Sequence, residues 1–494
     1  MLPSLQPRHG HLHTVNIKYG YLVLALTVLQ ALAAWALFHA YHRQWRQSGT
    51  PLHRLAAIVK MPVWVTISVW TVFIASIGVY HIEDLSEHYP TVAKRYGRIA
   101  YALLPFNIYL VLRPTSALSH PWGYYLQQLP LHKWLSRLIF VCVGVHAGLF
   151  FYKWTVQGTL GKVFQVWNLI GVVVFMAVAV VLVVSVRYLR WRYYRVFYVS
   201  HNVMAWLFVV GITLHARPGV LPLAGVCVVL VAVQAYHRFA AYTVTDADVE
   251  VVQNTALSSL QLVRIRQPAN FPKYLPASHI RVAYPTASYY AWLTPTHPYT
   301  LASLADDDSG TLELVVRKSS RLEFNPTAPK YALTGPYTSL PPPFFSSAKS
   351  ADIVCGGSGL SLGVPLYRHF RSQGIPATLV WCVRSKYDLH VLLHMAGVDG
   401  IRIYVTGADG PIFKIDDEDN HGLLDESAEI ELAALSPTDA AYTLGRPVLE
   451  EVLGQNAAES NHWAVSCGPE SLNSAVKAWA AQHQTHSFSE LYQM

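Results

Sequence analysis

Residues 131–151 read LHKWLSRLIFVCVGVHAGLFF, an apolar stretch that carries His132 near its start and His146 near its end. On an α-helix, at about 100° and 1.5 Å per residue, positions 14 apart lie within about 40° of one face and about 21 Å apart. Ionisable side chains are costly inside a membrane and are by default functional there. A helix formed by this stretch is therefore expected to hold one imidazole near each membrane surface.

Residues 201–215, HNVMAWLFVVGITLH, repeat the arrangement with His201 and His215. Both helices are expected to run outward from the cytosol, which places His132 level with His201 and His146 level with His215. Each matched pair can bind one haem iron from two sides, which favours electron transfer over oxygen binding at the iron. The alternative is that the spacings arise by chance or mark interfacial histidines at helix ends.

The chain as a whole is too apolar for an ordinary soluble protein, since 52% of its 494 residues are hydrophobic and only 13% are charged. The long apolar runs end near residue 239, and a mixed α/β pattern follows. We expect a tail at residues 1–18 and a membrane bundle of about seven spans at 19–239, with six or eight spans as alternatives. The expected spans are residues 19–40, 62–80, 97–113, 132–153, 166–187, 196–215 and 219–239.

Basic residues predict which loops face the cytosol. They follow the first span and separate the fifth from the sixth: Arg43, Arg46, Arg54, Lys60, Arg187, Arg190, Arg192 and Arg195. This orientation places the C-terminal half in the cytosol. The net charge of +8 does not indicate nucleic acid, because the basic residues lie beside apolar runs and not in stripes with interleaved aromatics. The five cysteines form no Cys-x-x-Cys pair, so neither a disulfide framework nor a zinc site is expected.

The C-terminal half is expected to contain two folds. Residues 243–345 show short alternating segments broken by prolines, which is typical of a small antiparallel barrel. Residues 351–494 change to strand, glycine turn, helix and strand, which predicts a nucleotide-binding α/β domain. Glycines at 356–359 let a backbone approach a pyrophosphate at a helix N-terminus, although such a loop alone is weak evidence. An acidic stretch near 416–431 is interpreted as a solvated insertion.

The chain resembles the ferric reductase and NADPH oxidase superfamily over nearly its whole length. The stretch from Asn16 onward is similar to the fungal ferric-reductase-like metalloreductase branch, and the four histidines match the family's pairs in the settings His132-Lys133-Trp134 and Phe197 to Asn202. The resemblance implies a multi-span α-helical membrane bundle with two b-type haems. It also implies a cytosolic ferredoxin-reductase-like module, in which an antiparallel β-barrel binds FAD and an α/β domain binds NADPH.

The resemblance further implies site residues. His297-Pro298-Tyr299-Thr300 is similar to the family's flavin motif, in which the aromatic ring packs on the isoalloxazine and the threonine bonds a flavin nitrogen. The expected FAD residues are His297, Pro298, Tyr299, Thr300, Arg317 on the pyrophosphate and Tyr492 over the flavin. The expected NADPH residues are Gly356, Gly357, Ser358, Gly359, Arg384 and Arg446 at the 2′-phosphate, and Cys467, Gly468 and Pro469 at the nicotinamide. Surface roles for Arg317, Arg384 and Arg446 are the alternative.

The resemblance to the metalloreductase branch implies a cell-surface metalloreductase that passes electrons from NADPH to ferric or cupric ions, with a role in iron and copper homeostasis. A superoxide-generating NADPH oxidase, with dioxygen as acceptor, is the alternative, and an inactive membrane scaffold or transporter is a remote one. The plasma membrane is favoured over the endoplasmic reticulum. Membrane lipid is the expected environment, and the oligomeric state is not predicted.

Overall fold

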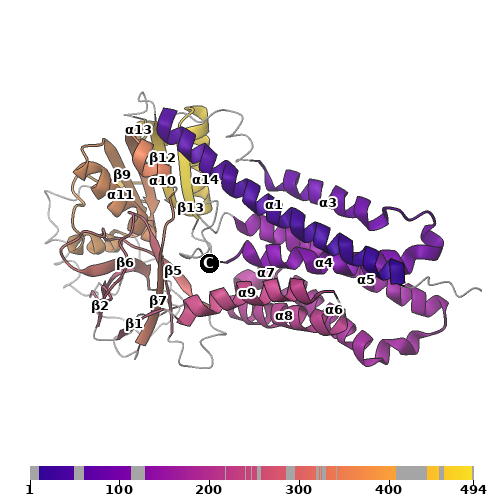
Figure 1. Ribbon diagram of the computed structural model, residues 1–494. Coiled ribbons are helices and arrows are strands. Elements are labelled where there is room, and N and C mark those ends of the chain that lie inside the picture. The colour runs from indigo at the N-terminus through magenta and orange to yellow at the C-terminus, as the bar shows by residue number, and fades with distance from the viewer. Residues whose placement is uncertain are drawn as a thin grey trace, which may run out of the picture. The chain divides into compact units, whose positions relative to one another are not determined.

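The computed structural model describes residues 10–48, 61–112, 128–216, 219–239, 241–245, 248–252, 257–284, 295–318, 322, 324, 330–340, 342–407, 442–454 and 461–491. These residues form two compact units that divide between residues 240 and 241. The first unit is helical and the second contains all the strands (Figure 1). The fold class expected from the sequence is therefore confirmed.

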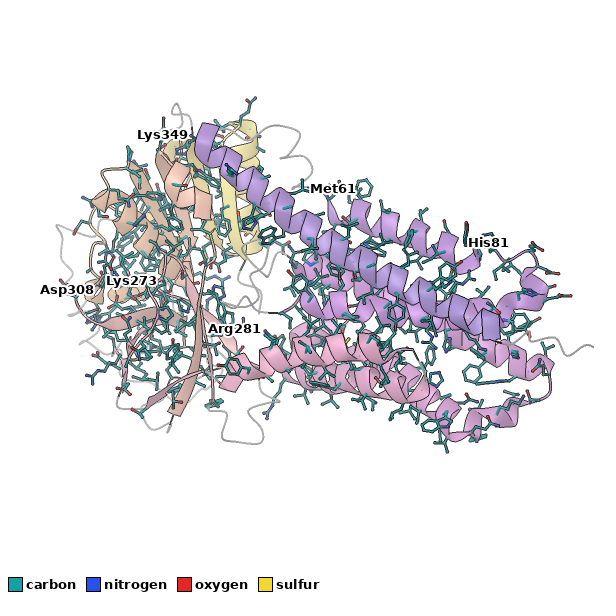
Figure 2. The ribbon with its side chains drawn as sticks, viewed as in Figure 1. Met61, His81, Lys273, Arg281, Asp308 and Lys349 are labelled. Atoms are coloured by element: carbon teal, nitrogen blue, oxygen red, sulfur yellow. The ribbon has the colours of Figure 1, made fainter. Side chains whose placement is uncertain are left out.

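The first unit consists of long helices that run beside one another. They are α1 (Gly10–Ser48), α3 (Val63–Val79), α4 (Leu85–Tyr109), α5 (Leu129–Val156), α6 (Val166–Val184), α8 (Tyr194–His215) and α9 (Leu221–Phe239), with the short η2 (Leu160–Phe164) and α7 (Arg187–Arg192) between them. Helix α4 packs against α1, α3, α5 and α9, and α6 packs against α8. In Figure 1 the axes of α1, α3 and α4 run in similar directions. Figure 2 labels Met61 and His81 at opposite ends of α3.

Two helices differ in extent from the sequence expectation. Helix α1 already begins at Gly10, so residues 10–18 of the expected N-terminal tail are helical. Helix α4 begins at Leu85, twelve positions before the expected span, because the Asp84 carboxylate accepts hydrogen bonds from the N–H and hydroxyl of Ser86 and caps the helix. The first half of α4 is polar, so hydropathy could not locate the N-terminus of this helix. The Asp84 cap marks it instead.

Four described helices are long and apolar enough to cross a membrane, and they contain residues 17–41, 129–156, 166–184 and 194–215. Two shorter apolar helices lie at Val63–Val79 and Leu221–Tyr236. Helix α4 contains Lys94, Arg95 and Arg98. Buried Arg95 donates to the carbonyls of Ile77 and Tyr80 at the end of α3, each at 2.8 Å, which compensates its burial. The number of spans stays a prediction.

The second unit begins with two antiparallel sheets around one core. One sheet has the order β1 (Tyr242–Thr245), β7 (Lys330–Tyr337), β4 (His279–Ala283), β5 (His297–Thr300), and the other has the order β2 (Val249–Val251), β3 (Leu260–Arg266), β6 (Thr311–Arg317). Alternate residues of all seven strands point into a shared apolar core. This is the expected antiparallel barrel architecture.

A six-stranded parallel sheet completes the unit. Its order is β11 (Tyr442–Leu444), β10 (Arg402–Val405), β9 (Ala377–Val383), β8 (Ser350–Gly356), β12 (His462–Gly468), β13 (His486–Leu491). Helices α11 (Leu360–Ser372) and α14 (Glu470–Gln482) pack on it, with shorter helices at α10 (Pro342–Ser347), η5 (Gly357–Gly359), η6 (Lys386–His394) and α13 (Leu449–Val452). The strand order reverses between β8 and β12, and in open α/β sheets ligands bind at the carboxyl ends beside such a switch point.

Candidate functional site

The first histidine pair joins α5 to α8. The ring centres of His132 and His201 are 6.2 Å apart. Nδ1 of His132 lies 3.0 Å from the carbonyl oxygen of Asn107, in the last turn of α4, where carbonyls lack helical partners. A carbonyl only accepts, so Nδ1 carries the proton and Nε2 keeps a free lone pair. Nδ1 of His201 is buried without a hydrogen-bond partner among the described residues.

The second pair joins the opposite ends of the same helices. The ring centres of His146 and His215 are 6.0 Å apart. Nδ1 of His146 donates to the carbonyl of Ala93 on α4 at 2.8 Å, and Nδ1 of His215 donates to the carbonyl of Trp167 on α6 at 2.7 Å. Both tautomers are therefore fixed with Nε2 unprotonated, which is the form that binds a metal.

These separations fit an iron shared by two imidazoles. An imidazole nitrogen binds a transition metal at about 2 Å and lies about 1 Å from its own ring centre, so rings on opposite sides of one ion have centres roughly 6 Å apart. The second pair also lines a mainly apolar cavity together with the basic side chains Lys94 and Arg98. A large apolar cofactor with acidic substituents suits such a lining. In the described parts of the chain, no three His, Cys, Asp or Glu side chains gather as an ion site.

The glycine loop of the second unit lies at the switch point of the parallel sheet. Cys467 of β12 is in register with Cys355 of β8, so the loop after β8 meets the segment after β12. A Cβ on Gly356 would lie 2.9 Å from Pro469 Cδ, and one on Gly468 would lie 3.2 Å from the nitrogen of Gly356. The two segments thus approach through their backbones, which only glycine allows.

The loop is held by a residue that the sequence did not single out. The indole Nε1 of Trp381 on β9 donates to the carbonyl of Gly357 at 2.8 Å, and Trp381 is fully buried. Gly357 has a φ of +56°, a conformation that other residues rarely adopt. A neighbouring-strand tryptophan carries no sequence signal for this contact, because only the register of β8 with β9 brings it to the loop.

The expected basic residues lie around this edge. Arg384 follows β9 and Arg446 follows β11, both exposed beyond the carboxyl ends of their strands. Arg317 ends β6, and its Nη2 lies 3.5 Å from the position that a Cβ on Gly357 would take. The structure therefore gathers Arg317, the glycine loop and the Cys467 segment, and it leaves Arg384 and Arg446 on the accessible side of the same sheet edge.

The flavin motif differs in one respect from the expectation. Strand β5 alternates so that His297 and Tyr299 are buried and Pro298 and Thr300 are partly exposed. The Tyr299 ring lies in the barrel core, 5.3 Å from the Phe324 ring, so it does not present an open face to a flavin. Pro298 and Thr300 occupy the accessible face instead, because consecutive residues of a strand point to opposite sides.

The start of β5 is held by a further residue that the sequence did not single out. Arg281 on β4, labelled in Figure 2, donates to the side chain of Thr296 at 2.7 Å and to its carbonyl. Tyr492 and the acidic stretch near 416–431 lie outside the described residues.

Comparison with known proteins identifies the family. Residues 96–212 match the model of a ferric reductase like transmembrane component, and residues 241–331 match the model of an FAD-binding domain. The probable metalloreductase AIM14 of Scheffersomyces stipitis is 41% identical, over 100% of this chain and 98% of that protein. The chain belongs to the ferric reductase family. It is a membrane oxidoreductase with an FAD-binding domain, as the resemblance implied.

Other members of the ferric reductase family match equally completely. The probable metalloreductases AIM14 of Candida dubliniensis and Debaryomyces hansenii are each 37% identical, over 99% and 100% of this chain and 99% of either protein. Among solved structures, a flavohemoglobin from Malassezia yamatoensis matches with a TM-score of 0.36 at 10% identity, covering 83% of this chain and 97% of that one. A ferredoxin reductase of carbazole 1,9a-dioxygenase gives 0.35 at 15%, covering 51% and 70%. Both scores are too low to define the fold.

Proposed function

We propose that this protein is a metalloreductase that takes electrons from NADPH, passes them through FAD and two b-type haems, and delivers them across a membrane to ferric or cupric ions. The observation that carries the proposal is that the same two helices bring together two histidine pairs, with ring centres 6.2 and 6.0 Å apart. When bound, FAD accepts a hydride and releases single electrons, and each haem carries one electron. One NADPH thus reduces two ferric ions and leaves NADP⁺ and a proton.

The chain's own residues hold these groups. His132 with His201, and His146 with His215, would each hold one haem through their ring nitrogens. The backbone carbonyls of Asn107, Ala93 and Trp167 orient three of the four rings. A haem held by two imidazoles would serve electron transfer and not ligand binding at its iron. Lys94 and Arg98 offer positive charge to acidic haem substituents.

The proposed NADPH site lies at the edge of the parallel sheet formed by the carboxyl ends of its strands. The glycine loop at 356–359 lets a pyrophosphate approach the backbone at the start of α11. Exposed Arg384 and Arg446 suit a 2′-phosphate, which favours NADPH over NADH. Thr300 on the accessible face of β5 can bond the flavin, and Arg317 can bond its pyrophosphate. We assign Cys467, in register with Cys355 beside the glycine loop, to the nicotinamide side of the site.

Names of relatives support metal ions as acceptors, since the curated matches are called probable metalloreductases. We place the C-terminal half of the chain in the cytosol, because the loops after the first span and between the fifth and sixth spans carry the basic residues. The 146/215 haem is then near the outer surface. The plasma membrane suits an extracellular metal better than the endoplasmic reticulum does, and the role is then in iron or copper homeostasis.

The test uses the purified full chain in detergent with FAD and NADPH under nitrogen. NADPH should reduce b-type haem bands, after which ferric chelate or air is added separately and reoxidation is followed. Fast reoxidation by ferric chelate with slow reoxidation in air is the expected result. Fast reoxidation in air with superoxide release identifies an oxidase instead, and absence of haem bands reducible by NADPH identifies a protein without this activity.

A further inference from the structure

Two glycines lie directly against the imidazoles of the second pair. A Cβ built on Gly97 of α4 would lie 2.7 Å from Nδ1 of His146, and one on Gly171 of α6 would lie 2.5 Å from Cε1 and 2.7 Å from Nδ1 of His215. Non-bonded atoms do not approach this closely, so any other residue at either position would displace the ring. All four residues line the same cavity.

Each glycine stands four positions after the carbonyl that orients its histidine. His146 donates to Ala93, four before Gly97, and His215 donates to Trp167, four before Gly171. The Cα–Cβ bond of a helical residue tilts toward the N-terminus, so the side chain at position i+4 covers the carbonyl of position i. A carbonyl has two lone pairs, of which the helix uses one. Glycine at i+4 leaves the other open to the imidazole.

Among the described glycines, none lies against the first pair in this way. His132 donates to Asn107 in the last turn of α4, where the carbonyl is open because the helix ends. Nδ1 of His201 is buried without a hydrogen-bond partner within the described residues. The glycine contacts therefore distinguish the 146/215 pair from the 132/201 pair, although both pairs have nearly the same ring separation.

We propose that Gly97 and Gly171 are positioning residues for the 146/215 haem. Because neither residue has a side chain, the carbonyls of Ala93 and Trp167 stay uncovered. Each imidazole can then donate from Nδ1 to a helix carbonyl and direct Nε2 toward the iron. The inference rests on the proposed function, since it requires that the pair binds haem. Neither glycine would contact the iron, and each acts through the histidine that it positions.

The test compares Gly97→Ala and Gly171→Ala with the wild type, with His146→Ala, and with Gly144→Ala as matched control. Gly144 lies on α5, two positions from His146, and a Cβ there meets nothing within 4 Å. Haem per chain is counted from the pyridine haemochrome, and the reduction of the haem bands is titrated potentiometrically. The wild type and Gly144→Ala should each show two haems and two redox components.

Gly97→Ala and Gly171→Ala should each resemble His146→Ala, with one haem per chain and loss of one of the two redox components. Two haems with unchanged potentials in both glycine variants would overturn the inference. Loss of both haems in the glycine variants, while His146→Ala keeps one, would also overturn it, because the glycines would then serve the packing of the whole bundle. A wild type without haem would refute the proposed function itself.

Discussion

The carboxylate of Asp388 accepts hydrogen bonds from both the backbone N–H of Ser259, at 2.7 Å, and its hydroxyl, at 3.0 Å. Asp388 belongs to η6 beside the parallel sheet, whereas Ser259 immediately precedes β3 of the barrel. The same carboxylate also accepts from the hydroxyl of Ser258 and the N–H of Leu260. One buried carboxylate thus joins the antiparallel barrel to the parallel sheet.

Replacing this carboxylate should loosen that junction. In Asp388→Asn, one acceptor oxygen becomes a donor amide that faces donors, and hydrogen bonds to a buried charge are worth about 1.5–3 kcal/mol. We expect a loss of about 2 kcal/mol in the free energy of unfolding, measured by flavin release from the full chain in denaturant. Asp306→Asn is the control, because Asp306 is 84% exposed and should change stability by less than about 0.5 kcal/mol. Equal losses in both variants would contradict the prediction.

A second junction is the ion pair between Arg368 of α11 and Asp307 of the barrel. The guanidinium binds both carboxylate oxygens, at 3.0 and 2.6 Å, and each side chain is only 19% exposed. A double-mutant cycle with Arg368→Met and Asp307→Asn should give a coupling energy of about 1–2 kcal/mol. The exposed pair Lys273 and Asp306, put through the same cycle, should give less than about 0.5 kcal/mol. A coupling at Arg368 no larger than this reference would speak against a structural role.

The histidine pairs predict which haem each variant loses. If the first pair holds one haem, His132→Ala and His201→Ala should remove the same haem, because each would leave it with only one of its two imidazoles. The double variant should therefore retain as much haem as either single variant, and effects within a pair should not add. Haem content and the remaining redox component provide the measurement. If His132→Ala removed the component that His215→Ala removes, the assignment of pairs would be wrong.

Thiol chemistry provides a prediction that does not depend on any cofactor. Burial raises the pKa of the Cys382 thiol to about 12 and raises that of Cys355 as well. The thiolate is the reactive form and exists above the pKa, so both thiols stay protonated and unreactive near pH 8. Iodoacetamide should leave Cys355 and Cys382 unmodified in the native protein and label both after denaturation, as read by mass spectrometry. Rapid native labelling at pH 8 would contradict the raised pKa of these thiols.

The sequence by itself determined the class of the fold and which residues to examine. Apolar runs and their lengths predicted the helical bundle, since hydropathy is a local property of the chain. The 14-residue spacing placed His132 and His146 on one face, because helix geometry fixes that angle. The strand, glycine turn, helix and strand predicted from residue 351 onward appear as β8, the loop at 356–359, α11 and β9, because each is a local pattern of the chain.

The tertiary structure alone decided how those residues are held. Nothing in the sequence links His146 to the carbonyl of Ala93, or Trp381 to Gly357, because backbone acceptors have no residue type and the contacts span separate elements. The core contact of Tyr299 with Phe324 likewise depends on which face of β5 the two antiparallel sheets enclose. Periodicity defines faces of single elements, whereas the packing of elements against one another decides what each face meets.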